Sequence, residues 1–136
     1  DRICENTTKV ASFLQAHPKA AWVNYAGLAD HPDHALVQKY MGGRASGIIN
    51  FGVKSADGDG KAAGARFQDA LKLVTRLVNI GDCKSLACHP ASTTHRQLSV
   101  DELAKAGVAP DMVRLSIGIE HIDDILADLD QALAAV

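Results

Sequence analysis

Segments with the two-residue period of a β-strand alternate along this chain with segments that have the period of an α-helix. In residues 47–54, Ile49, Phe51 and Val53 share one face, which predicts a half-buried strand. Further strands are predicted at residues 21–25 and 113–119, and helices at residues 1–16, 32–41, 61–78 and 121–135. This order predicts an α+β fold, an α/β two-layer sandwich in which helices cover one face of a small mixed or antiparallel sheet.

Length and charge narrow the classes of protein to which the chain can belong. Its 136 residues correspond to one domain, and 47% of them are hydrophobic, which allows a packed core. Fourteen basic and sixteen acidic residues give a net charge of -2, which argues against nucleic acid as a partner. No apolar run reaches the roughly 18 residues of a membrane span. Three cysteines at irregular spacing favour a reducing, cytoplasmic setting over a disulfide framework.

A long polar segment separates the predicted helix 61–78 from the next helix. Residues 79–98 are rich in small and polar side chains, with a short strand predicted at residues 86–88. A loop of this length is uncommon in a compact domain and is usually functional. Ser99 and Glu102 then have the spacing of a capping box, which starts a short helix that Gly107 ends. We therefore look for a functional site first in residues 79–98.

Two cysteines and two histidines in this segment raise the alternative of a metal site. Cys83, Cys88, His89 and His95 lie within thirteen residues, and all four are potential zinc ligands. Their spacing is not a common zinc-finger spacing, and adjacent residues on a strand point to opposite faces. We favour the competing interpretation, a buried Cys88 beside histidines that hydrogen-bond to the backbone.

Arg114 interrupts the otherwise apolar strand predicted at residues 113–119. It can be an edge-strand residue whose charged head reaches solvent. It can also bind a carboxylate or phosphate, because a planar guanidinium forms two parallel hydrogen bonds that a lysine cannot.

Several segments together resemble a known enzyme family. They are Gly81-Asp82 with Lys84-Ser85-Leu86, His89-Pro-Ala-Ser-Thr-Thr-His95, and Arg114-Leu-Ser-Ile-Gly-Ile-Glu120. Upstream, Val23-Asn-Tyr-Ala-Gly-Leu28 followed by His31-Pro32 adds to the pattern. The combination resembles the Cys/Met-metabolism family of enzymes that depend on pyridoxal phosphate. Within that family the motifs are most similar to those of the O-acetylhomoserine sulfhydrylases.

The resemblance implies a fold and a role for three residues. The fold is that of the C-terminal domain of fold-type I pyridoxal-phosphate enzymes. In the family, the arginine of the last motif binds the α-carboxylate of the amino-acid substrate, which implies this role for Arg114. Asn79 and Thr94 correspond to residues that shape the same pocket. Holding the carboxylate fixes the orientation of the bond to be broken.

The resemblance also implies that the cofactor site lies outside this chain. The family chemistry needs a lysine bonded to pyridoxal phosphate, and none of the eight lysines has the family's sequence context. We therefore expect residues 1–136 to be the C-terminal small domain, without the large cofactor-binding domain. Alone, this domain is expected to be inactive. The parent enzyme is expected to be a homotetramer.

The reaction implied by the resemblance is γ-replacement, in which O-acetylhomoserine and sulfide give homocysteine and acetate. The alternatives within the family are cystathionine γ-synthase, O-succinylhomoserine sulfhydrylase and methionine γ-lyase. A non-catalytic remnant domain is a further alternative. The presence of Arg114, Asn79 and Thr94 argues against it, because a retired pocket has no use for a buried guanidinium.

Overall fold

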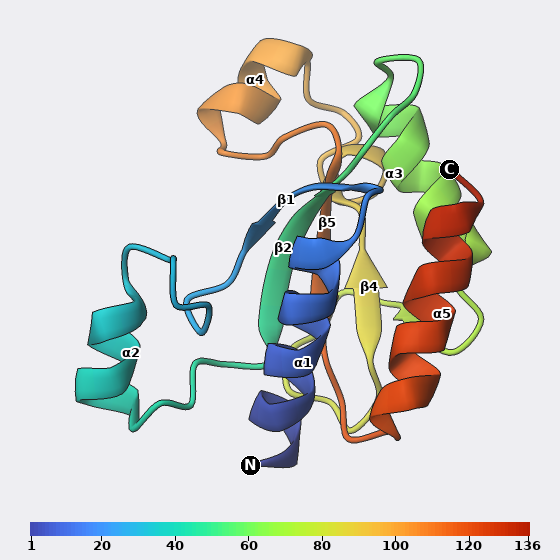
Figure 1. The fold of residues 1–136 in the computed structure, drawn as a ribbon. Helices are drawn as coiled ribbons and strands as arrows, with labels where there is room; N and C mark the ends of the chain where they lie inside the picture. The colour runs from blue at the N-terminus through green and yellow to red at the C-terminus, as the bar shows by residue number, and fades with distance from the viewer.

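The structure, a computed structural model, describes residues 1–136 and contains one five-stranded sheet with helices on one face (Figure 1). The helices are α1 (Arg2–Ala16), α2 (His34–Met41), α3 (Gly60–Ala70), α4 (Val100–Lys105) and α5 (Ile122–Ala134), with a short 3₁₀ helix η1 (Pro90–Ser92). The strands are β1 (Ala20–Asn24), β2 (Ile48–Val53), β3 (Thr75–Arg76), β4 (Leu86–Cys88) and β5 (Met112–Ser116). The predicted α+β two-layer fold is confirmed. None of the helices is long and apolar enough to cross a membrane.

The sheet is mixed and has the strand order β1-β2-β5-β4-β3. All neighbouring strands pair antiparallel except β3 and β4, which are parallel. The central strand β5 aligns Arg114 with Asn50 of β2 on one side and with Cys88 of β4 on the other. Residues far apart in the sequence thus form one row across the middle of the sheet.

The core lies between the sheet and helices α1, α3 and α5. Alternate residues of β2 and β5, among them Phe51 and Leu115, are fully buried on this face. The rings of Phe51 and Phe67 of α3 pack edge to face, with centroids 5.4 Å apart. Helix α2 instead projects away from the sheet at the β1 side (Figure 1).

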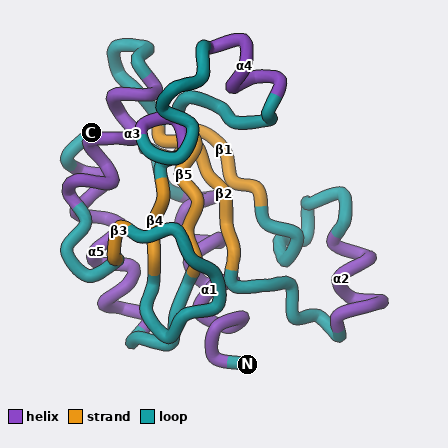
Figure 2. The backbone as a smooth tube through the Cα atoms, turned by 180° about the vertical axis from the view of Figure 1, so that it is seen from behind, coloured by secondary structure: helices purple, strands orange, loops and turns teal.

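The opposite face of the sheet, named the polar face for the Asn50, Arg114 and Ser116 side chains on it, carries the long loop. Because strand residues alternate between faces, Asn50, Arg114 and Ser116 point away from the helices. Figure 2 shows, from this side, that the segment after β3 crosses in front of the sheet. The backbone N–H of Gly81 donates to Ser116 Oγ at 3.3 Å and ties this segment to β5. The loop therefore lies over the face of the sheet that carries Asn50, Arg114 and Ser116.

The helix predicted at residues 61–78 is wrong beyond Ala70. Helix α3 ends there, and Leu71 already has an extended backbone. The carboxylate of Asp128, in α5, accepts hydrogen bonds from the N–H groups of Lys72, Leu73 and Val74 at 2.8–2.9 Å. These three amides are therefore held by a side chain from another helix, and the chain continues into β3 rather than into further helical turns.

The other predicted elements agree with the structure to within a few residues at their ends. The capping box is confirmed, because Ser99 Oγ accepts from the N–H of Glu102 while the Glu102 carboxylate accepts from the N–H of Ser99. The short strand predicted at residues 86–88 is β4. Strand β5 ends at Ser116, earlier than predicted, and the N–H of Ile117 donates instead to the carbonyl of Gly47.

Candidate functional site

The loop between β3 and β4 is fastened to the end of β5 by the two sequence motifs themselves. Glu120 accepts from the N–H of Ser85 through Oε1 at 2.6 Å and from Ser85 Oγ through Oε2 at 2.9 Å. Ser85 Oγ in turn accepts from the N–H of Gly118 at 2.9 Å. The N–H of Ile119 donates to the carbonyl of Cys83 at 2.9 Å. The Lys-Ser-Leu and Gly-Ile-Glu motifs are therefore joined by hydrogen bonds, and the contact between Ser85 and Glu120 is named the clasp.

Gly118 is needed because the loop backbone passes directly over it. A Cβ atom at this position would lie 2.2 Å from the carbonyl oxygen of Cys83 and 2.5 Å from Glu120 Oε2. Its φ angle is not positive, so the requirement comes from the close approach and not from backbone strain. On the helix side, Asn6 of α1 donates from Nδ2 to the carbonyls of Gly118 at 3.1 Å and Glu120 at 3.0 Å.

Arg114 lies on the polar face, half-buried beneath this loop. Its Nη2 approaches the carbonyl oxygen of Asn79 at 3.5 Å, the outer limit of a hydrogen bond. None of the four ion pairs in the chain includes Arg114. Its guanidinium thus has no carboxylate partner within the chain and has donors left for an anionic ligand.

The structure brings Asn79 to Arg114 but does not join Thr94 to either residue by a hydrogen bond. Asn79 is exposed, and its Oδ1 accepts from the N–H of Ile80 at 2.9 Å. Thr94 is also exposed, and its hydroxyl pairs with His95 Nδ1 at 2.8 Å. Two of the three predicted site residues therefore meet, and the third lies in the loop that follows η1.

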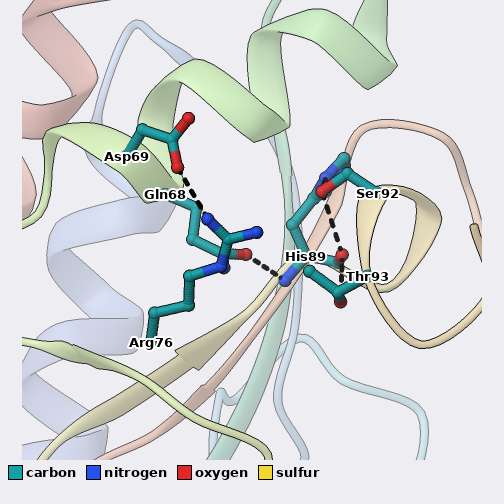
Figure 3. A network of polar contacts seen from close by, with 6 residues as sticks. All are labelled: Gln68, Asp69, Arg76, His89, Ser92 and Thr93. Atoms are coloured by element: carbon teal, nitrogen blue, oxygen red, sulfur yellow. Dashed lines mark hydrogen bonds and ion pairs between the residues drawn. The ribbon is translucent and has the colours of Figure 1, made fainter.

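His89 has a structural role that occupies both of its ring nitrogens, and Figure 3 shows it beside Ser92, one of the two partners. Its Nε2 lies 2.8 Å from the carbonyl oxygen of Pro110, which can only accept, so Nε2 carries the proton. Its Nδ1 accordingly accepts from the hydroxyl of Ser92 at 2.7 Å. Burial is the main cause that lowers the pKa of His89 from its usual value. The neutral imidazole therefore holds β4, η1 and the segment before β5 together.

The four possible zinc ligands do not form a site. Cys83 is exposed, Cys88 is buried, and His89 is committed to Pro110 and Ser92. No three histidine, cysteine, aspartate or glutamate side chains come together in an arrangement that could hold a metal ion. The expectation of a buried Cys88 and of a backbone partner is confirmed for Cys88 and His89, whereas His95 pairs with the hydroxyl of Thr94.

The residues of this chain do not fit the cofactor that the resemblance implies. A lysine bonded to pyridoxal phosphate has to lie inside a pocket. Seven of the eight lysines are exposed at the surface, and the half-buried Lys19 donates to the carbonyl of Val136. These lysines therefore do not form a cofactor site in this structure, and what this chain offers is the unpaired guanidinium of Arg114.

Sequence comparison identifies the same family as the motifs that these contacts join. Residues 1–134 match the family described as Cys/Met metabolism PLP-dependent enzyme. The chain belongs to the Cys/Met-metabolism family of pyridoxal-phosphate-dependent enzymes. It is 50% identical to O-acetyl-L-homoserine sulfhydrylase 1 of Thermus thermophilus, over 98% of this chain and 31% of that protein. It is 43% identical, over its whole length, to L-methionine gamma-lyase of Pseudomonas deceptionensis, of which it covers 33%.

Solved structures of the Cys/Met-metabolism family show the same fold. A crystal structure from Campylobacter jejuni, assigned to O-acetylhomoserine (thiol)-lyase, superposes with a TM-score of 0.86 at 44% identity. The overlap covers 98% of this chain and 31% of that one, which carries a pyridoxyl-lysine phosphate. Cystathione gamma lyase of Micromonospora echinospora superposes with a TM-score of 0.85 at 33% identity, over 99% and 34% of the two chains. The chain thus spans about a third of the length of the relatives it matches.

Several residues that build the site were not singled out by sequence reasoning. Asn6, Gln68 and Asp128 are buried polar residues within helices, and each hydrogen-bonds to the backbone of a distant segment. One signal was available, since a polar residue on the apolar side of a helix has to find a partner. The identity of that partner depends on the tertiary fold, which the pattern of a single helix does not contain.

Proposed function

We propose that this chain is the C-terminal, substrate-carboxylate-binding domain of an O-acetylhomoserine sulfhydrylase. The parent enzyme would exchange the acetyloxy group of O-acetylhomoserine for sulfide, giving homocysteine and acetate. Pyridoxal phosphate, bound by the preceding part of the parent chain, supplies the electron sink for this exchange. The names of several relatives, two of them O-acetyl-L-homoserine sulfhydrylases at 50% identity, support this proposal.

The observation that carries the proposal is the state of Arg114. It is half-buried in the middle of the polar face, between Asn50 and Cys88, and no acidic side chain neutralises it. A guanidinium in this position is costly unless an anion accompanies it. A substrate carboxylate would supply that anion and would accept two parallel hydrogen bonds.

The surrounding residues position the guanidinium for this task. The clasp between Ser85 and Glu120 fixes the loop, and the loop places the carbonyl of Asn79 against Arg114 Nη2. The amide of Asn79 and the hydroxyl of Thr94 are both exposed and able to contribute further polar contacts to the bound amino acid. This chain would therefore bind and orient the substrate, while a lysine elsewhere in the parent would move the protons.

Steady-state kinetics of the parent enzyme with Arg114→Lys test the proposal. Lysine keeps the charge but cannot form the two parallel bonds, so we expect the KM for O-acetylhomoserine to rise at least tenfold. The KM for sulfide should change by less than twofold, because sulfide has no carboxylate. Arg44→Lys is the matched control, since Arg44 forms an exposed ion pair with Asp1 and lies outside the site.

An unchanged KM for O-acetylhomoserine in Arg114→Lys would refute the carboxylate-binding role. The same assay separates the members of the family. A different member of the family would be identified by a preference for other substrates. These are O-succinylhomoserine for its sulfhydrylase, cysteine with a homoserine ester for cystathionine γ-synthase, and methionine for methionine γ-lyase. If the unmodified parent protein turns over none of these substrates, a non-catalytic remnant is favoured.

The proposal also includes the inactivity of the isolated domain. Since no lysine of residues 1–136 is buried and none has the family's sequence context, the purified domain should form no lysine-linked absorption band with added pyridoxal phosphate. It should also release no acetate from O-acetylhomoserine. Either signal in the isolated domain would show that a cofactor site exists within these residues.

A further inference from the structure

A hollow lies at the β3 edge of the sheet, next to the row of residues that contains Arg114. It has a volume of about 330 Å³, which falls within the range of small-molecule sites. Its apolar wall is made by Leu77, Val78, Ala87 and Cys88. Its polar lining consists of Gln68, Arg76 and Thr93. None of the residues proposed to hold the substrate carboxylate lines this hollow.

The hollow lies where the hydrogen-bond ladder between β3 and β4 stops, because a side chain takes the place of the next backbone acceptor. In the parallel pair of β3 and β4, Thr75 and Leu77 donate to the carbonyls of Ser85 and Ala87. Continuing the ladder would give the N–H of His89 to the carbonyl of Leu77. Instead, this N–H donates to Gln68 Oε1 from helix α3 (Figure 3). The strand β3 therefore stops, and the space beyond it stays open.

This contact leaves a buried donor without a partner. Because Oε1 of Gln68 accepts from a backbone N–H, the other atom of the amide has to be the NH₂ group. Gln68 is only 3% exposed, and its Nε2 has no hydrogen-bond partner. Such donors are rare in folded proteins, and each calls for an explanation such as a bound water, an ion or a functional role. Gln68 lines the hollow and its Nε2 is covered by neighbouring side chains, so a ligand there can supply the missing acceptor once one of them moves aside.

A guanidinium stands beside this donor. Arg76 lines the hollow, and its Nη1 is held by Asp69 at 2.9 Å, which leaves its other N–H groups available. Its side chain is 56% exposed, so it can move aside to admit a ligand. Arg76 and Thr93 also line an adjoining polar hollow of about 580 Å³ that contains Arg96. The polar end of the site thus offers donors and positive charge.

We propose that this hollow binds a small aliphatic carboxylate, separate from the substrate site at Arg114. The carboxylate would accept from Gln68 Nε2 and from Arg76, and the aliphatic chain would lie against Leu77, Val78 and Ala87. The hydroxyl of Thr93 already donates to the carbonyl of His89 at 2.7 Å, so it does not compete for the acid. A neutral acceptor would satisfy Gln68 but would leave the charge of Arg76 unused.

Isothermal titration calorimetry on the full-length parent protein tests this proposal, with sodium 4-methylpentanoate as the probe. We expect saturable binding of one molecule per chain, and at least tenfold weaker binding of the neutral 4-methylpentanamide. Gln68→Glu keeps the acceptor for His89 and replaces the donor by a negative oxygen, so it should weaken binding at least tenfold. Arg76→Gln, an exposed substitution that removes the charge, should do the same. Gln38→Glu on helix α2 has the same charge change as the first variant and should leave the affinity within twofold.

Arg114→Gln distinguishes this site from the proposed substrate site. If 4-methylpentanoate binds in the hollow, its affinity in Arg114→Gln stays within twofold of the unmodified protein. Loss of binding in Arg114→Gln together with normal binding in Gln68→Glu and Arg76→Gln would overturn the proposal. Absence of saturable binding to the unmodified protein, or equal affinity for the amide, would overturn it as well. Each of these results is independent of turnover, so failure of the sulfhydrylase assignment does not decide them.

Discussion

Glu120 holds Ser85 with both oxygens of its carboxylate, at 2.6 Å to the backbone N–H and 2.9 Å to the hydroxyl. The two residues are 35 positions apart, and each belongs to one of the motifs noticed in the sequence. Their contact sets where the β3–β4 loop lies and therefore where the carbonyl of Asn79 meets Arg114. The motifs thus contain residues that hold the loop in place, Ser85 and Glu120, as well as the proposed site residue Arg114.

Replacing Glu120 by glutamine should loosen this clasp. The charge of the carboxylate is lost and one of its two oxygens becomes an NH₂ group, so the charge-assisted hydrogen bonds from Ser85 are weakened or lost. We expect the free energy of unfolding to fall by about 1–3 kcal/mol, measured by urea denaturation. Glu5→Gln, at an exposed position in the first turn of α1, is the control and should change stability by less than about 0.5 kcal/mol. Equal stability of the two variants would show that the clasp contributes nothing.

Gly118→Ala should destabilise the domain through a backbone collision. The added methyl group would lie 2.2 Å from the Cys83 carbonyl oxygen and 2.7 Å from the Lys84 carbonyl carbon, so the loop has to move. Overpacking of this kind costs about 1–3 kcal/mol, and displacement of the loop should also raise the KM for the amino-acid substrate in the parent enzyme. Urea denaturation and kinetics check the two effects. Wild-type stability and an unchanged KM would contradict the close approach of loop and strand.

Asp128→Asn should destabilise the junction between α3 and β3. The carboxylate accepts from three consecutive backbone N–H groups, and an asparagine would turn a donor toward at least one of them. We expect a loss of about 2–3 kcal/mol in the free energy of unfolding. Asp124→Asn, an exposed change on the same helix, is the control. Amide hydrogen exchange gives a local test, because the N–H groups of Lys72 and Leu73 should exchange faster only in Asp128→Asn.

The same junction shows where reading the sequence reaches its limit. Periodicity located the amphipathic helices and the alternating strands correctly, because each pattern is local. Residues 71–77 also continue a helical pattern, with Val74 and Leu77 in phase with Phe67. The helix nevertheless ends at Ala70, since the amides that follow are taken by Asp128, 54 or more positions away. Strand β3, two residues long, has no local signal strong enough to outweigh that pattern.

The site was predictable to a similar degree. The motifs pointed to Arg114 and Asn79, and the fold brings these two together. Thr94 was predicted in the same pocket, but its hydroxyl pairs with His95. The part of all three residues in substrate binding stays a prediction. The roles of Gln68 and His89 depend on helix α3 packing next to η1, at the end of β4. That packing brings Gln68 Oε1 to a backbone amide 21 positions away, and no spacing in the sequence expresses it.

The pH dependence of stability offers a direct test of the role of His89. In the folded chain burial lowers the pKa of this imidazole, while in the unfolded chain it has the ordinary value of about 6.5. Below pH 6.5 the imidazole therefore binds a proton in the unfolded state but stays neutral in the folded state until the pH reaches its lower folded pKa. The contribution of the neutral His89 is complete above pH 6.5 and is lost progressively as the pH falls toward the lowered folded pKa.

We expect the free energy of unfolding to fall more steeply between pH 7 and pH 5 in the unmodified domain than in His89→Gln, because glutamine does not titrate. At pH 7 the variant should be less stable by about 1–3 kcal/mol, since the bonds to Pro110 and Ser92 are disturbed. The difference between the two curves removes the titration of the other five histidines, which both proteins share. An NMR titration of the imidazole gives an independent reading, with the His89 midpoint expected below 6.5. Parallel stability curves, or a midpoint at or above 6.5, would contradict the buried neutral imidazole that joins η1 to the sheet.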